Sequence, residues 1–317
     1  MATVTKEIEN ITFHRTRMGY GITLIAFSLL IFFAFGLNTQ AGTQTKFGMN
    51  LAGSQAIPIS DLVVPSQAVV YGCAFILAFL GAFQLARGIP YTGLLVGAIA
   101  LAFVTAFLTW AAADKSFNLV GMLNTSLVRA TPIALAALCG VISERSAVIN
   151  IGIEGIMLLA AQAAVVIGTV TGNLYLGLLS ALIIGGLIAA LHAFLVIRFK
   201  VDQIVSGVAI NIIGAGVTSF ASSRFLEKNT NALNNSGTFP VVSIPLLSKI
   251  PVIGPVLFEN NIIVYLTILL VIIVHIVLFY TPWGLRTRAV GEHPKAADTL
   301  GVNVYLTRYI NVILGGI

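Results

Sequence analysis

Long apolar runs with few charges constrain this chain more than any other feature of its sequence. A membrane-spanning helix needs about 20 mostly apolar residues. Such runs lie near residues 19–37, 68–86, 91–112, 123–142, 151–171, 175–197, 203–220 and 261–280. A further apolar run from Tyr305 to Ile317 is too short to cross a bilayer. The sequence predicts an all-α integral membrane protein, a polytopic helical bundle with eight complete transmembrane helices and a truncated ninth, and we expect the natural protein to continue.

Composition supports a bilayer environment. Hydrophobic residues make up 58% of the 317 positions and charged residues 9%, whereas a soluble domain has roughly 25% charged residues. In a membrane protein, the formal net charge of +6 does not indicate affinity for nucleic acid, and no nucleic-acid partner is expected. The cysteines lie in apolar runs and the histidines are scattered, so no metal site or disulfide framework is predicted.

The distribution of lysine and arginine predicts the orientation of the chain. Cytoplasmic connections are enriched in these residues, and placing residues 1–18 in the cytoplasm satisfies this rule. On the cytoplasmic side then lie Lys6, Arg15, Arg17, Arg87, Arg145, Arg198, Lys200, Arg286, Arg288, Lys295 and Arg308. On the outer side lie Lys46, Lys115, Arg224, Lys228 and Lys249. We expect a transmembrane domain over 19–317 with outer loops 38–67 and 221–260 and a cytoplasmic loop 281–305, in a cell membrane.

The loop 281–305 carries a short predicted helix. Pro282 and Gly284 end the preceding span, and Pro294 suits the first position of a helix. Gly301 suits the left-handed residue that terminates it. Ala296 and Ala297 would expose a small surface that could fit a groove on a soluble partner. The same pattern fits an ordinary interfacial helix that only connects two spans, and the physics alone favours neither interpretation.

Four segments resemble a known family. "RAVGEHPKAADTLGV" (288–302) resembles the coupling loop of permease subunits in the branched-chain amino acid, ribose and nucleoside group of ABC importers, and "ERSAVINIGIEGIMLLAA" (144–161) resembles that group's other signature. "VDQIVSGVAINIIG" (201–214) and "SIPLLSKIPVIGPVLF" (243–258) are similar to the branch that handles nucleosides and simple sugars with a basic-membrane-protein-type lipoprotein receptor. The resemblance extends from about residue 120 to 317.

The resemblance implies a transport subunit without enzymatic activity. Such a permease pairs with a second permease, often as a heterodimer, and an external lipoprotein delivers the solute. A separate cytoplasmic ATPase binds ATP and Mg, so no cofactor is expected on this chain. The absence of a G-x-x-x-x-G-K-[ST] motif agrees with this division. The expected ATPase contacts are Arg286, Arg288, Gly291, Glu292, Pro294, Ala296, Ala297 and Gly301.

Glu154 is an isolated carboxylate near the start of an apolar run. Asn150 can cap the helix that follows, and Gly152 and Gly155 allow a neighbouring backbone to approach closely. One interpretation is a buried structural acid that fixes the start of the helix. The other is a gating residue that transmits motion from the coupling helix through Arg145, because ionisable residues within membrane segments are functional candidates.

Gln203, Gly207 and Asn211 form a polar stripe, because their i, i+4, i+8 spacing puts them on one helix face. The stripe either packs against another helix or lines the solute path. The lone His192 and His275 are interpreted as packed or interfacial residues rather than proton relays.

Two other functional classes compete with this interpretation. An ion-gradient-driven secondary transporter of a small polar solute often contains inverted repeats, and no repeat is apparent in the sequence. An intramembrane enzyme would need a cluster of catalytic or metal-binding residues, and no such cluster appears.

Overall fold

The computed structural model describes residues 17–89 and 91–317. Within them, eight helices are long and apolar enough to cross a membrane, and they confirm the eight predicted spans. These are Arg17–Gly36, Ser66–Ala86 (α2), Thr92–Ala111 (α3), Leu119–Glu144 (α4), Ile153–Thr171 (α5), Leu174–Arg198 (α6 and η2), Gln203–Leu226 (α7 and η3) and Ile262–Tyr280 (α10). The predicted boundaries differ from these by a few residues.

The chain divides into two compact units. The first contains the described residues up to Asn124 together with Pro245–Val256. The second contains Thr125–Ile244 and Leu257–Ile317. Because the second unit holds the loop 281–305, Glu154 and the polar stripe, it contains the predicted site residues.

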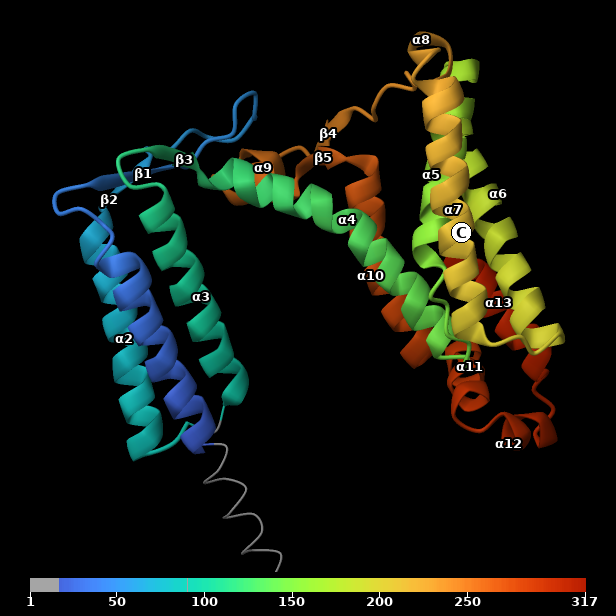
Figure 1. The fold of residues 1–317 in the computed structure, drawn as a ribbon, viewed down its shortest axis with the longest axis horizontal. Coiled ribbons are helices and arrows are strands. Elements are labelled where there is room, and N and C mark those ends of the chain that lie inside the picture. Colours follow the sequence, from blue (N-terminus) through green and yellow to red (C-terminus); the bar gives the residue numbers. More distant parts are fainter. Residues whose placement is uncertain (1–16, 90) are drawn as a thin grey trace, which may run out of the picture. The chain divides into compact units, whose positions relative to one another are not determined.

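The first unit is built around the Arg17–Gly36 helix, α2 and α3, which pack side by side (Figure 1). Leu24, Leu77 and Leu95 are fully buried between these helices. Three strands that the sequence did not predict form a small sheet in the order β2-β1-β3. They are β1 (Gln44–Gly48), β2 (Leu62–Pro65) and β3 (Ser116–Asn118), with β2 antiparallel and β3 parallel to β1.

The second unit is built around α5, α6, α7 and α13 (Val304–Gly316). In Figure 1 these helices lie side by side. Val148, Ile156 and Val312 contribute to a shared core. Gly185 lies so close to α13 that an added Cβ would come within 2.3 Å of the Gly316 carbonyl oxygen. The predicted ninth apolar segment is therefore a helix packed against α6.

The long loop 221–260 contains no spanning helix, as its prolines predicted. The preceding span ends in a π-helical turn, η3 (Ser222–Leu226), after α7 (Gln203–Ala221). Short elements follow: α8 (Thr230–Leu233), β4 (Val241–Ser243), η4 (Leu247–Lys249), α9 (Ile253–Leu257) and β5 (Glu259–Asn261). β4 and β5 pair in antiparallel fashion.

Candidate coupling site

The loop 281–305 begins with a sharp turn into α11 (Pro282–Glu292). The Thr281 hydroxyl accepts a hydrogen bond from the Gly284 amide at 3.2 Å, and Pro282 occupies the first turn. A Cβ on Gly284 would lie 2.2 Å from the Val277 carbonyl oxygen. Only glycine therefore allows the chain to fold back this closely on the end of α10. The sequence located this break but did not predict that a helix resumes at once.

The predicted short helix is present as α12 (Pro294–Thr299). The ring Nδ1 of His293 accepts a hydrogen bond from the Ala296 amide at 3.1 Å and caps its start. Gly301 has φ +82°, its amide donates to the Asp298 carbonyl, and the Val302 amide donates to the Ala297 carbonyl. This pair of bonds is a Schellman motif, which satisfies carbonyls at a helix end. The helix is thus fixed at both ends.

The exposed face of α12 differs from the predicted one. Ala297 is only 3% exposed, so the expectation that it presents a surface to a partner is wrong. Its side chain faces inward, while Ala296 faces solvent. Leu300 is 84% exposed and lies four residues after Ala296, on the same helix face. Leu300 was missed because the sequence alone could not say which face of α12 is covered.

The two arginines of α11 have different surroundings. Arg286 and Glu292 are exposed. Arg288 is half-buried, with its guanidinium 5.2 Å from the centre of the Phe279 ring, and the Arg145 guanidinium is 5.9 Å from the same ring. A cation over an aromatic face is favourable. Arg288 therefore packs against α10, and only part of its side chain remains available to a partner.

At Gly291, α11 packs closely against the segment that joins α4 to α5 (145–152, the α4–α5 connection). A Cβ at Gly291 would lie 2.3 Å from the Arg145 carbonyl oxygen, so its close approach requires glycine. On the other side of this connection, Arg308 Nε of α13 donates to the Ser146 carbonyl at 3.1 Å. The α4–α5 connection is therefore held between α11 and α13. Gly291 packs against this connection within the chain.

Asn150 does not cap α5. Its side-chain oxygen accepts a hydrogen bond from the Gly152 amide at 3.1 Å, which forms a local turn before the helix begins. Gly152 occupies the cap position and offers no side chain. The first turn of α5 is capped from α7 instead. The Asn211 side-chain oxygen accepts a hydrogen bond from the Gly155 amide at 2.7 Å. That amide is in the first turn, where no intrahelical partner exists.

Glu154 is exposed on the first turn of α5, so the expected burial is not found. Across residues 17–89 and 91–317, no hydrogen bond or ion pair involves its carboxylate, and Arg145 instead lies near the Phe279 ring. Its proximity to the α4–α5 connection follows from the sequence, since α5 begins directly after that connection.

The polar stripe of α7 lies against the α4–α5 connection and the first turn of α5. Gln203 accepts from the Ile149 amide, and the Asn211 amide nitrogen donates to the Ile151 carbonyl at 2.9 Å. A Cβ on Gly207 would be 2.8 Å from the Gly152 nitrogen. The stripe thus forms a close helix contact in this chain.

The two lone histidines have different surroundings. His192 is fully buried, with Nδ1 3.0 Å from the Ser206 hydroxyl and Nε2 3.2 Å from the Ile149 carbonyl. A carbonyl only accepts, so Nε2 carries the proton and Nδ1 accepts from Ser206. The His275 ring lies 5.1 Å from that of Phe279. His192 therefore fits the predicted packing role, whereas the side chain of His275 is exposed and contacts the Phe279 ring. In the described part of the chain, no group of three or more His, Cys, Asp or Glu could hold a metal ion.

The spans and their packing define a multi-pass helical membrane protein. Residues 122–317 match the family of branched-chain amino acid transport system permease components. Because this match covers more than half of the chain, the chain belongs to that family.

Three relatives are similar to this chain. The guanosine ABC transporter permease protein NupQ of Bacillus subtilis is 43% identical over 202 residues, 61% of this chain and 62% of that protein. The putative glucose ABC transporter permease protein TsgC13 of Haloferax volcanii is 40% identical over 62% of this chain and 59% of its own length. The nucleoside ABC transporter permease protein NupC of Lactococcus lactis is 37% identical over 60% and 62%, respectively. The matched region is thus about three fifths of each relative. No solved structure matches the chain.

Proposed function

We propose that this chain is the membrane-spanning permease subunit of an ATP-driven ABC importer that moves a nucleoside or related simple-sugar-like solute into the cell. Family membership and the names of the relatives support the transport class. The observation that carries the proposal is α12, a helix that is capped at both ends and presents an exposed leucine.

The proposed docking face consists of Ala296 and Leu300 on α12, and α11 adds the exposed charges of Arg286 and Glu292. Complete burial of a leucine side chain contributes about 1.5–3 kcal/mol. A leucine held outward on a rigid helix is therefore a strong anchor for a groove on the ATPase subunit. That subunit would bind ATP and Mg, since the sequence lacks the phosphate-binding motif named above. A second permease and an external solute-binding lipoprotein complete the proposed assembly.

The proposed path of motion follows the contacts of α11. A displacement of α12 by the ATPase would move α11, which touches the Arg145 carbonyl through Gly291. Arg308 holds the neighbouring Ser146. The α4–α5 connection leads directly into α5, whose first turn is bound by Asn211 of α7. Rigid movement of packed helices is one general way in which such transitions occur.

The substitution Leu300→Glu tests the docking face. Leu300 buries almost nothing in this chain, so the variant should fold normally. Placing a charge in an apolar groove should reduce ATPase binding by at least about tenfold, which is about 1.4 kcal/mol. The measurements are co-purification with the proposed partner ATPase and ATP-dependent uptake of radiolabelled nucleosides in vesicles.

The matched control is Leu246→Glu, at a leucine that is 81% exposed in the loop 221–260. This variant should retain ATPase binding and uptake. Equal binding by the Leu300→Glu protein and the unchanged protein would refute the docking face. Solute accumulation by the purified chain from an ion gradient, without nucleotide, would refute the importer itself and favour a secondary transporter.

A further inference from the structure

A cavity of about 360 Å³ lies beside α12 in the second unit. It is lined by residues of the α4–α5 connection, the η2–α7 turn, α12 and the start of α13. Ala296 and Leu300 do not line it, whereas Lys295 and Asp298 do. The cavity therefore lies along a different face of α12 from the proposed docking face.

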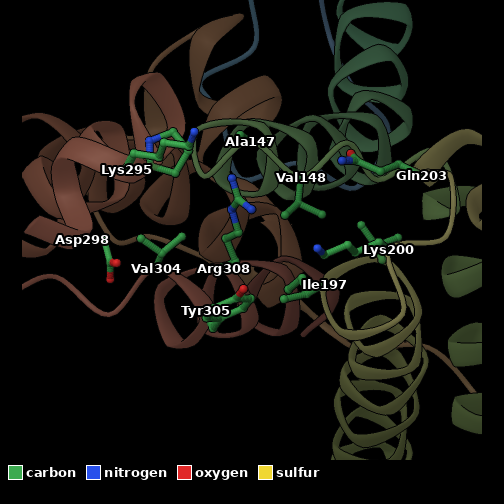
Figure 2. A pocket seen from close by; sticks show the side chains of 12 residues that line it. Ala147, Val148, Ile197, Lys200, Gln203, Lys295, Asp298, Val304, Tyr305 and Arg308 are labelled. Carbon is green, nitrogen blue, oxygen red and sulfur yellow. The ribbon is translucent and has the colours of Figure 1, made fainter.

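Three cationic side chains from three segments line this cavity. Figure 2 shows Arg308 between Lys200 on one side and Lys295 on the other. Asp298 is the one acidic residue in the lining, and it forms no ion pair with these cations among the described residues. Like charges that share a cavity repel one another, so a bound anion would be stabilised there.

The backbone holds two of these cations in place. Arg308 Nε donates to the Ser146 carbonyl, and Figure 2 shows the guanidinium extending toward Ala147, at the centre of the residues that line the cavity. Lys200 has φ +55°, and the Val201 amide next to it donates to the Leu195 carbonyl at 3.1 Å. The turn that carries Lys200 is thus fixed by hydrogen bonding.

Apart from Gln203, the remaining lining is mostly apolar, and part of it belongs to the ends of apolar helices. Val196 and Ile197 come from η2 (Phe194–Arg198), the last turn of the sixth span. Val304 and Tyr305 come from the first turn of α13. Lys200 stands between two spans, where the chain emerges from the bilayer. Tyrosine, lysine and arginine are the residues that occur at this depth, beside lipid headgroups.

We propose that this cavity binds the phosphate group of an anionic phospholipid in the leaflet on the side of the loop 281–305. The cations contact the phosphate, and the apolar walls contact the glycerol and upper acyl region. Basic pockets between transmembrane helices recognise lipid headgroups in this way. An acidic protein segment would pair with the cations but would leave the valine and isoleucine side chains at the membrane surface without an apolar partner, which a lipid provides. The bound lipid would hold α12 against the bilayer independently of any ATPase.

The test measures retention of phosphatidylglycerol and of phosphatidylcholine by the purified chain in native mass spectrometry. One phosphatidylglycerol should be retained in preference to phosphatidylcholine. Each cation near a membrane surface contributes about 1 kcal/mol, or about fivefold in affinity. Lys200→Asn should weaken binding by about fivefold, because asparagine tolerates the left-handed backbone of this turn and the fold should persist. Lys295→Gln should have a similar effect.

The matched control is Arg224→Gln, which removes an exposed arginine of the second unit outside the cavity and should leave retention unchanged. Equal retention of the two lipids, or unchanged phosphatidylglycerol binding by both lysine variants, would overturn the proposal. Displacement of the lipid by millimolar inorganic phosphate would identify a free-anion site instead. Displacement by a hexaglutamate peptide would identify a protein contact, and either result refutes the lipid assignment.

Discussion

At the scale of single residues, the position of the Glu154 charge bears on whether this residue stabilises the fold or acts in gating. The carboxylate lies in the first turn of α5, beside the positive end of the helix dipole. That interaction contributes about 0.3–1 kcal/mol at an exposed position. Its exposure, and the absence of a bonding partner within the described residues, mean that the fold depends little on the charge. We therefore propose that Glu154 acts in gating rather than in holding the helix.

The substitution Glu154→Gln keeps the shape of the side chain and removes its charge. If Glu154 acts in gating, nucleoside uptake should fall by at least about tenfold, corresponding to about 1.4 kcal/mol, while the amount of assembled transporter stays normal. Uptake in vesicles and quantification of the purified complex measure the two effects. Glu227→Gln, at an exposed glutamate directly after η3, is the matched control and should transport normally. Normal uptake by the Glu154 variant would rule out gating.

At the scale of elements, α5 and α7 pack closely at glycines and are hydrogen-bonded through the side-chain amide of Asn211. A Cβ on Gly155 would lie 2.4 Å from the Ile210 carbonyl oxygen, and one on Gly214 would lie 2.6 Å from the Gly155 Cα. This close approach brings Asn211 within reach of both the Gly155 amide and the Ile151 carbonyl. The start of α5 is therefore completed by α7.

The substitution Asn211→Leu should destabilise this helix pair. It removes a cap and leaves the Ile151 carbonyl without its donor, at a cost of about 1–3 kcal/mol. The expected result is a lower apparent unfolding temperature in detergent. Asn211→Asp retains the acceptor for the Gly155 amide and should lose less stability. Equal unfolding temperatures for the leucine variant and the unchanged protein would contradict the capping role.

At the scale of the whole molecule, two compact units share eight membrane spans within the described residues. The second unit alone brings together the loop 281–305, the α4–α5 connection and the α5–α7 contact. Coupling between the proposed docking face and the start of α5 therefore needs no contact outside this unit. The orientation of the spans remains a prediction from the charge distribution.

Cysteine labelling tests this orientation. The two native cysteines lie in α2 and α4, so both are first replaced by alanine. An impermeant maleimide added to intact cells should then label Lys228→Cys, in the loop 221–260, but not Lys295→Cys, in α12. Inverted membrane vesicles should give the opposite pattern, because the positive charge of the loop 281–305 predicts a cytoplasmic location. Both lysines are exposed in the structure, so both cysteines should be accessible to the reagent. Labelling of Lys295→Cys from outside the cell would show that the predicted orientation is inverted.

Local sequence information determined the membrane class, the eight spans, the break at Pro282 and the limits of α12. These features depend on the length of an apolar run or on proline and glycine within a few positions, so they can be inferred from neighbouring residues. The tertiary structure decided that Ala297 is covered, that Leu300 is exposed and that Asn211, not Asn150, caps α5. Asn211 and Gly155 are 56 residues apart. Which groups meet over such a separation depends on how the helices pack, and hydrophobic periodicity in the sequence does not specify that packing.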